Sequence, residues 1–142
     1  MTPTPRRLST RGRALNRRME QAGLTFESGI LESCLRRRPD DSEVLAELAE
    51  ACTRLRRYRR GLQLDRRLVR RHPKDPIVRY NLACSLALTG DLPGAARELL
   101  AAARLGYRDV DHLMRDPDLR RLRRDPSFTE LRAQLERIAR EG

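Results

Sequence analysis

The side chains that could act as nucleophiles, bases or metal ligands are few and scattered along the chain. The 142 residues include two histidines, and three cysteines at Cys34, Cys52 and Cys84. The cysteines are 18 and 32 residues apart and form no CxxC pair, so their spacing does not match a metal site. Each falls on an apolar helical face. We therefore expect small, reduced core residues rather than a redox centre.

The histidines and the Asp-Pro pairs are better suited to ending and starting helices than to catalysis. His72 stands at a predicted helix end, where a cation favours the helix dipole, and His112 is expected in a short linker. The Asp-Pro pairs at 116–117 and 125–126 can each cap a helix and occupy its first position. The sequence lacks a glycine-rich phosphate loop, an HExxH pattern and a GxSxG pattern. These features predict a protein that is not an enzyme and that uses no metal and no cofactor.

Arginine dominates the charge of the chain. The formal net charge is +11, and Lys74 is the one lysine among 31 basic residues. Residues 1–38 carry nine arginines and three acidic residues, so more than half of the excess lies there. Such an excess favours acidic partners, RNA or an anionic surface. Because GC-rich coding also produces it, the charge alone is a weak indication of nucleic-acid binding.

The apolar content favours a thin, elongated helical core. Apolar residues make up 39% of the chain and aromatic residues 4%, below the roughly 45–50% apolar share of ordinary globular domains. No stretch approaches the roughly 18 apolar residues of a membrane span, so no membrane segment is expected. Residues 1–18 are basic and lack an apolar segment, which argues against a secretory signal. We expect a cytoplasmic protein, with a transit peptide as the alternative.

The sequence repeats itself at a constant offset of 34 residues, which is the separation of Pro39 and Pro73. The other matching positions are Asp41/Asp75, Val44/Val78, Leu48/Leu82, Ala49/Ala83, Gly61/Ala95 and Arg70/Arg104. In each unit, apolar residues at helical spacing predict a first helix, over 42–55 and 76–88. The second helices run from Tyr58 to His72 and from Leu92 to about Leu105. Gly90 is expected to adopt a left-handed conformation between the two helices of the later unit.

This pattern resembles the tetratricopeptide repeat, a helix–turn–helix unit of about 34 residues with small residues where the helices cross. The residues that carry the resemblance are Tyr80-Asn81-Leu82-Ala83, Thr89-Gly90-Asp91, Ala95 and Leu99, together with Leu45, Leu48, Ala49, Tyr58, Gly61 and Pro73. The resemblance implies an all-α, tetratricopeptide-like α-α superhelix with two clear repeats over 39–106.

The two ends of the chain are expected to complete this superhelix. Residues 1–7 are predicted to form a flexible basic tail. Residues 8–38 are interpreted as a degenerate N-terminal repeat or capping helices, with a first helix near 8–22 and a second that ends at 36–38. Residues 107–142 look like the helical ending of many bacterial members of the family, which covers the last repeat.

Two residues depart from the family pattern. Asp65 stands where a large apolar residue is usual, and Arg79 stands where an aromatic residue is frequent. Either both side chains face solvent, or they pair with each other across the junction between the repeats.

The resemblance implies a scaffold or adaptor that binds a peptide or helix of a partner protein. By the family's geometry, the groove is lined by Glu43, Ala46, Glu50, Thr53, Ile77, Tyr80, Cys84, Ala87 and Leu88, with Asn81 placed to bond a bound backbone. Ala46 and Glu50 replace the Lys and Asn of chaperone-binding members, so a carboxylate clamp is not expected. The alternative is that the C-terminal helix of the chain itself fills this groove.

A second candidate surface is a basic ridge on the convex face. It comprises Arg59, Arg60, Arg66, Arg67, Arg70 and Arg71, extended by Arg36, Arg37 and Arg38. In the alternative function, this ridge binds nucleic acid. No aromatic residues are interleaved for base stacking, and no RNA-module signature is present. The other interpretation of the ridge is a solvated helix face, and a third function is self-association.

Overall fold

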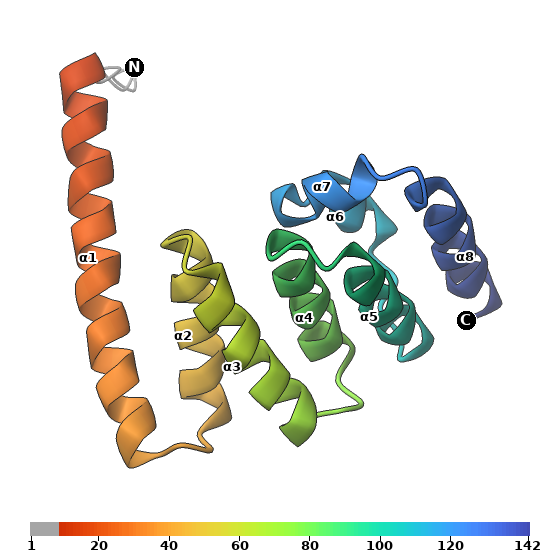
Figure 1. Ribbon diagram of the computed structural model, residues 1–142, viewed down its shortest axis with the longest axis horizontal. Helices are drawn as coiled ribbons and strands as arrows, with labels where there is room; N and C mark the ends of the chain where they lie inside the picture. The colour runs from red at the N-terminus through yellow and green to blue at the C-terminus, as the bar shows by residue number, and fades with distance from the viewer. Residues whose placement is uncertain (1–8) are drawn as a thin grey trace, which may run out of the picture.

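The computed structural model describes residues 9–142, and within that range every regular element is a helix (Figure 1). The helices are α1 (Thr10–Arg37), α2 (Ser42–Arg54), α3 (Tyr58–Arg71), α4 (Pro76–Leu88), α5 (Leu92–Arg104), α6 (Val110–Arg115), the 3-10 helix η1 (Pro117–Leu119), α7 (Arg120–Arg123) and α8 (Phe128–Glu141). From α1 to α5, each helix packs against the next in chain order. The serial stacking confirms the predicted all-α superhelix.

Aspartate caps repeat with the sequence and set where the helices begin. Asp41 accepts hydrogen bonds from the Glu43 and Val44 amides at 3.1 and 3.2 Å. Asp75, at the equivalent position of the next repeat, accepts from the amides of residues 77 and 78 in the same way. Asp91 accepts from the Gly94 amide at 2.9 Å at the start of α5. Each carboxylate satisfies amides that have no partner inside the helix.

The turns within the two hairpins share a left-handed residue, but only one of them is glycine. Gly90 has φ = +92°, as the sequence predicts. Its counterpart in the preceding repeat is Arg56, with φ = +58°. A side chain in this region costs about 1 kcal/mol or more. The earlier turn therefore keeps the repeat geometry at the expense of backbone strain.

Small and aliphatic side chains fill the core. Gly61, Ala83 and Ala95 are buried where the helices cross, as predicted. One buried cluster lies between α1, α2 and α3 and includes Leu35, Leu48 and other residues of these helices. A second runs from α4 through α8. Cys52 and Cys84 are buried thiols, but Cys34 is exposed, so the prediction of a core position for Cys34 was wrong.

The N-terminal part of the chain differs from the expected pair of helices. Residues 10–37 form one continuous helix, because no proline or turn sequence interrupts it between the Ser9 cap and Arg37. Ser28, Leu31 and Leu35 are its buried residues, and α1 packs on α2. The predicted flexible tail, residues 1–7, lies outside the described residues.

Asp65 and Arg79 neither pair with each other nor both face solvent. Asp65 is 5% exposed and accepts a 2.5 Å hydrogen bond from the Ser85 hydroxyl on α4. Arg79 instead pairs with Glu98 on α5 at 3.2 Å. Both interpretations of these residues were therefore wrong, because polar partners on neighbouring helices satisfy each side chain separately.

The segment after α5 folds back over the second hairpin. η1 and α7 contact α4, while α8 packs against α5. His112 lies on α6 rather than in a linker, because Asp109 caps a short helix there and accepts from the His112 amide at 2.9 Å. Within residues 9–142, no helix combines the length and the hydropathy needed to cross a bilayer.

Candidate functional site

A pocket of about 370 Å³ opens between the first helices of the two hairpins. One wall is α2 and the opposite wall is α4, with the end of α6 and the start of η1 along the rim. The lining residues are Ala46, Glu47, Ala49, Glu50, Thr53, Asp65, Leu68, Tyr80, Asn81, Cys84, Ser85, His112, Asp116 and Asp118. We call this site the acidic pocket.

The acidic pocket opposes the charge of the chain as a whole. Five carboxylates line it, from Glu47, Glu50, Asp65, Asp116 and Asp118, and none of the described residues lining it is Arg or Lys. The whole chain carries a net charge of +11. A concave site lined by one sign of charge concentrates the field of that charge. The pocket therefore favours a cationic group over a neutral or anionic one.

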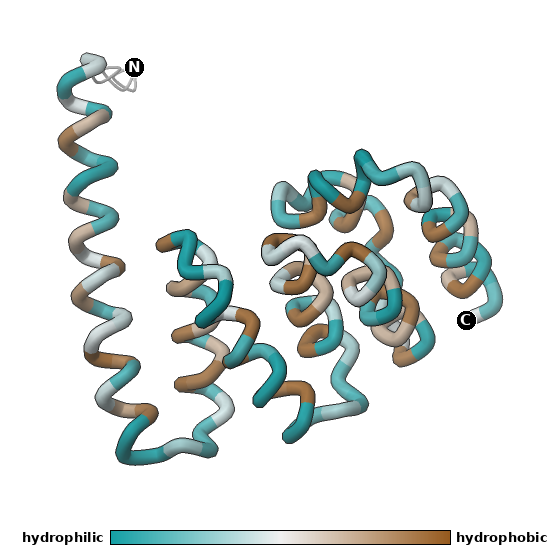
Figure 2. Tube along the Cα trace, viewed as in Figure 1, coloured by the Kyte–Doolittle hydropathy of each residue, from teal (hydrophilic) through white to brown (hydrophobic). Residues whose placement is uncertain are grey.

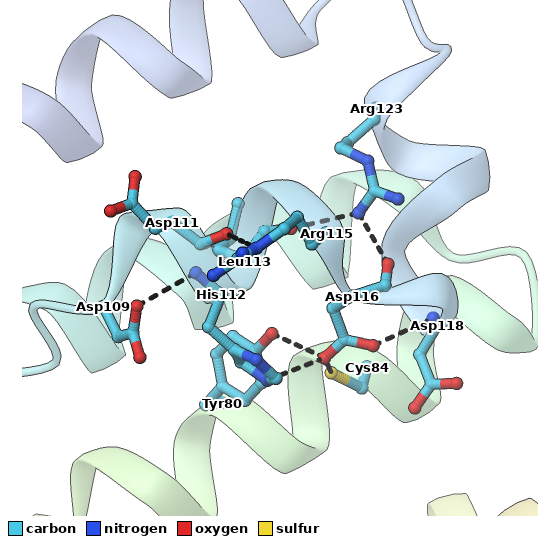
Figure 3. A network of polar contacts seen from close by, with 10 residues as sticks. All are labelled: Tyr80, Cys84, Asp109, Asp111, His112, Leu113, Arg115, Asp116, Asp118 and Arg123. Atoms are coloured by element: carbon cyan, nitrogen blue, oxygen red, sulfur yellow. Dashed lines mark hydrogen bonds and ion pairs between the residues drawn. The ribbon is translucent and has the colours of Figure 1, made fainter. Parts of the chain in front are cut away.

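A network around Asp116 builds the rim of the pocket (Figure 3). One Asp116 oxygen accepts from the Asp118 amide at 3.0 Å, as the predicted cap does. The other accepts from the Tyr80 hydroxyl at 2.6 Å and lies 3.5 Å from His112 Nε2. The Arg123 guanidinium donates to the Asp116 carbonyl at 2.6 Å and thereby holds α7 against the end of α6. One aspartate thus caps η1 and ties it to α4.

Tyr80 is held by stacking as well as by its hydroxyl. Its ring lies 4.5 Å from that of Tyr107, centroid to centroid, at an interplanar angle of 12°. Burial, followed by the hydrogen bond to Asp116, raises the pKa of Tyr80. The phenol therefore stays protonated and acts as a donor. It fixes the rim and is not a base.

Asp65 lies on the α3 side of the pocket as a buried carboxyl group. Burial raises its pKa to about 6, against an opposing contribution from the Ser85 hydrogen bond. Burial, followed by the nearby Asp116 carboxylate, also raises the pKa of Asp118. No arginine or lysine among the described residues lines the acidic pocket beside either group. A bound cation would relieve the cost of ionising both groups.

Three atoms on the rim are close enough to hold a metal ion, but their surroundings favour hydrogen bonding. The Cys84 sulfur and one oxygen each of Asp116 and Asp118 lie within 4.8 Å of one another. Burial raises the pKa of Cys84, which keeps it a thiol, whereas a metal ligand is a thiolate. That thiol donates to Asp116 at 3.7 Å. The Asp116 carboxylate therefore already accepts hydrogen bonds from Cys84 and Tyr80.

The structure brings six of the ten predicted groove residues together in the acidic pocket. They are Ala46, Glu50, Thr53, Tyr80, Asn81 and Cys84. Glu43 is exposed at the start of α2, and Ile77 is 55% exposed on α4. Leu88, with Ala87, lines a separate pocket of about 340 Å³ beside α7. The last helix does not fill the groove. Instead, α6 and η1 cover the Tyr80–Cys84 side of it.

Sequence reasoning missed the acidic members of the site other than Glu50. The sequence places Asp116 and Asp118 beside Pro117, at a predicted helix start. That role explains the Asp116 oxygen that caps η1, but not the oxygen that accepts from the Tyr80 hydroxyl. Asp65 was noticed as an anomaly at an apolar position. That anomaly, a carboxylate where the repeat calls for a large apolar residue, was the available signal.

The basic ridge is partly engaged by the rest of the chain. Arg60 pairs with Glu32 at 2.8 Å, Arg71 with Asp40 at 3.2 Å, and Arg67 donates to the Pro39 carbonyl. The pairing with Glu32 raises the pKa of Arg60 and lowers that of Glu32. The other three predicted ridge residues, Arg59, Arg66 and Arg70, are exposed and make no ion pair with the residues described. The extension at 36–38 is also exposed.

Stacked helical hairpins with small crossing residues and a groove between their first helices define a helical-repeat protein. The family model for the tetratricopeptide repeat matches residues 30–76 and 54–109, more than half of the chain. The chain belongs to the tetratricopeptide repeat family. Repeats of this family generally mediate protein–protein interactions, and the family is typically non-catalytic. Neither the curated proteins nor the solved structures contain a match to the chain.

Proposed function

We propose that the protein is an adaptor that binds a segment of a partner protein in the groove between α2 and α4. A basic side chain of that segment enters the acidic pocket. The observation that carries this proposal is the set of five carboxylates, without Arg or Lys among the described lining residues, in a chain of net charge +11. In this proposal, residues 8–38 and 107–142 act as the terminal caps of the stack.

The pocket offers a cation two kinds of contact. Glu47 and Glu50 belong to exposed positions of α2, where a carboxylate can meet an incoming guanidinium or ammonium group. Asp65 is buried and ionises at a cost that a nearby cation would lower. Arginine matches this arrangement best, because its planar guanidinium binds a carboxylate through two parallel hydrogen bonds.

The remaining wall of the groove suits the apolar or backbone parts of a bound segment. Ala46, Ala49 and Thr53 present small side chains from α2. Asn81 is exposed on α4 and offers an amide that both donates and accepts. A short extended or helical segment with one arginine between small or apolar residues fits these features.

Fluorescence anisotropy with short labelled peptides tests the proposal. The probes are peptides with a central arginine among alanine and leucine residues, and the same peptides with glutamate or citrulline in its place. We expect the arginine peptides to bind and the others to bind at least tenfold more weakly. Equal binding of all three peptides, or none, would overturn the proposal.

Variants separate the acidic pocket from general charge attraction. Glu50→Gln and Asp118→Asn remove carboxylates from the lining, while Glu20→Gln removes one from exposed α1. The change in formal charge is the same in all three. We expect the pocket variants to weaken binding of the arginine peptide several-fold and the α1 variant to leave it unchanged.

A further inference from the structure

The outer face of α1 carries large apolar side chains that the fold leaves exposed. Leu15, Met19 and Phe26 are 59%, 64% and 73% exposed, and Ile30 is 49% exposed. The buried residues of the helix, Ser28, Leu31 and Leu35, are the ones that pack toward α2. Helix α1 lies at the edge of the stack (Figure 1), and apolar positions recur along its whole length (Figure 2). This face has room for another helix.

The spacing of these residues is that of a helix seam. Leu15, Met19, Ala22 and Phe26 follow one another at intervals of four, three and four residues. Gly29 and Ser33 continue the series at three and four. This 3.5-residue period is the one that lets two helices pack side by side over several turns. From 15 to 33 the seam spans about 27 Å.

We propose that α1 pairs in antiparallel orientation with α1 of a second copy of the chain. The seam is complementary to itself: Leu15 would face Ser33 of the second copy, and Met19 would face its Gly29. Phe26 would face Ala22 of the second copy. The two residue numbers in each of these pairs add up to 48, so one two-fold axis beside residue 24 produces all of them. In every pair, a large side chain meets a small one.

Two glycines within α1 support a close approach of helices on this face. Glycine weakens a helix relative to alanine. A Cβ atom added to Gly23 or Gly29 would meet nothing within 4 Å among residues 9–142 of the same chain. Neither glycine has a positive φ. The fold of one chain therefore gives no reason for these glycines, whereas a second helix close to the α1 backbone would.

The charges beside the seam are also complementary in this arrangement. Arg18 and Glu32 lie on the same flank of the seam, one turn or more on either side of its centre. Antiparallel pairing places Arg18 of each copy near Glu32 of the other. Glu32 already holds Arg60 of its own chain at 2.8 Å, so Arg18 would join an existing pair. Pairing with a second copy thus brings opposite charges together.

Sedimentation velocity of the full chain over about a hundredfold range of concentration tests the proposal. We expect a monomer–dimer equilibrium. Gly29→Leu fits the single chain and favours its helix, but it blocks the facing Met19 and should weaken the dimer at least tenfold. Phe26→Asp should do the same. Ile77→Asp, at a 55% exposed site on α4, is the matched control and should leave the dimer unchanged.

Disulfide cross-linking tests the orientation. In a Cys34→Ser background, we expect a mixture of the Met19→Cys and Gly29→Cys variants to form a 19–29 disulfide faster than either variant alone. A monomer at every concentration, or a dimer that neither α1 variant weakens, would overturn the proposal. So would preferential 19–19 cross-linking.

Capture of the chain by anionic phosphatidylserine vesicles through Phe26, without self-association, would assign the face to a membrane surface instead. Gly29→Leu should leave binding of the arginine peptide unchanged, so the two proposals fail separately.

Discussion

The Tyr80 hydroxyl donates to the Asp116 carboxylate across 2.6 Å, and this buried bond joins residues 36 positions apart in the chain. It connects α4 of the second hairpin to the start of η1. The same carboxylate oxygen accepts a hydrogen bond from the Cys84 thiol. The rim of the acidic pocket therefore depends on a contact between the repeat and the segment that follows it.

Removing this hydroxyl should destabilise the protein. A hydrogen bond to a charged group contributes about 1.5–3 kcal/mol, so Tyr80→Phe should lower the free energy of unfolding by about that amount. Urea denaturation followed by circular dichroism measures the loss. Tyr58→Phe is the control, because Tyr58 makes no hydrogen bond through its hydroxyl among the residues described. Equal effects of the two variants would contradict the role given to the Tyr80–Asp116 bond.

Asp65 should make the stability of the protein fall as pH rises. Its pKa of about 6 lies above the ordinary value of 3.8. Between these values, the folded state holds a proton that the unfolded state has released, so the free energy of unfolding decreases from pH 4 to pH 6. The free energy of unfolding stays lower by the full amount, about 3 kcal/mol, at pH 7.

Asp65→Asn should remove this pH dependence. We expect the variant to match the natural protein at pH 4 and to be more stable at pH 7 by as much as about 3 kcal/mol. Urea unfolding of both proteins across this range provides the comparison. If the variant loses as much free energy of unfolding between pH 4 and pH 7 as the natural protein does, another group causes the pH dependence.

The strained turn between α2 and α3 should be improved by glycine. Arg56 is exposed with φ = +58°, whereas Gly90 occupies the equivalent position of the next repeat. We expect Arg56→Gly to raise the free energy of unfolding by roughly 0.5–1 kcal/mol, because relief of the strain exceeds the added entropy of the unfolded chain. Thermal unfolding measures this change. Gly90→Ala should act in the opposite direction.

The last helix should contribute strongly to stability through its contact with α5. Phe128 is 7% exposed and belongs to the cluster that contains Leu99 and Ala102. Phe128→Ala should cost about 3–5 kcal/mol, because it leaves a cavity in that cluster. Thr129→Ala, at the next and exposed position, should change stability by less than about 0.5 kcal/mol. Differential scanning calorimetry of both variants distinguishes these outcomes.

The fold could be predicted from the sequence because local signals agree with one another. Asp41 and Asp75 stand at equivalent positions of successive repeats and cap equivalent helices. Gly90 marks its turn, and small residues mark the helix crossings. Residues 10–37 differ from the prediction because a degenerate repeat was expected to have two helices, whereas the residues between Ser9 and Arg37 include no proline or turn sequence that would end a helix.

The site was only partly predictable because its second side comes from beyond the repeats. The positions on α2 and α4 follow from repeat geometry, which predicts that Glu50, Asn81 and Cys84 share one groove, and all three line the acidic pocket. Asp116 reaches the pocket through the path of the chain after α5. No spacing rule within the sequence encodes that path. The partner of Asp65 likewise lies 20 residues away, on a neighbouring helix.

Mapping an arginine-containing peptide by two-dimensional NMR tests the central claim most directly. The backbone amides of Ala46, Thr53 and Asn81 report on the acidic pocket, while those of Arg59 and Arg66 report on the opposite candidate surface. We predict that shifts on titration will concentrate at the first three residues and will be abolished by Glu50→Gln combined with Asp118→Asn. Shifts confined to Arg59 and Arg66, or no shifts at any of these amides, would contradict the account.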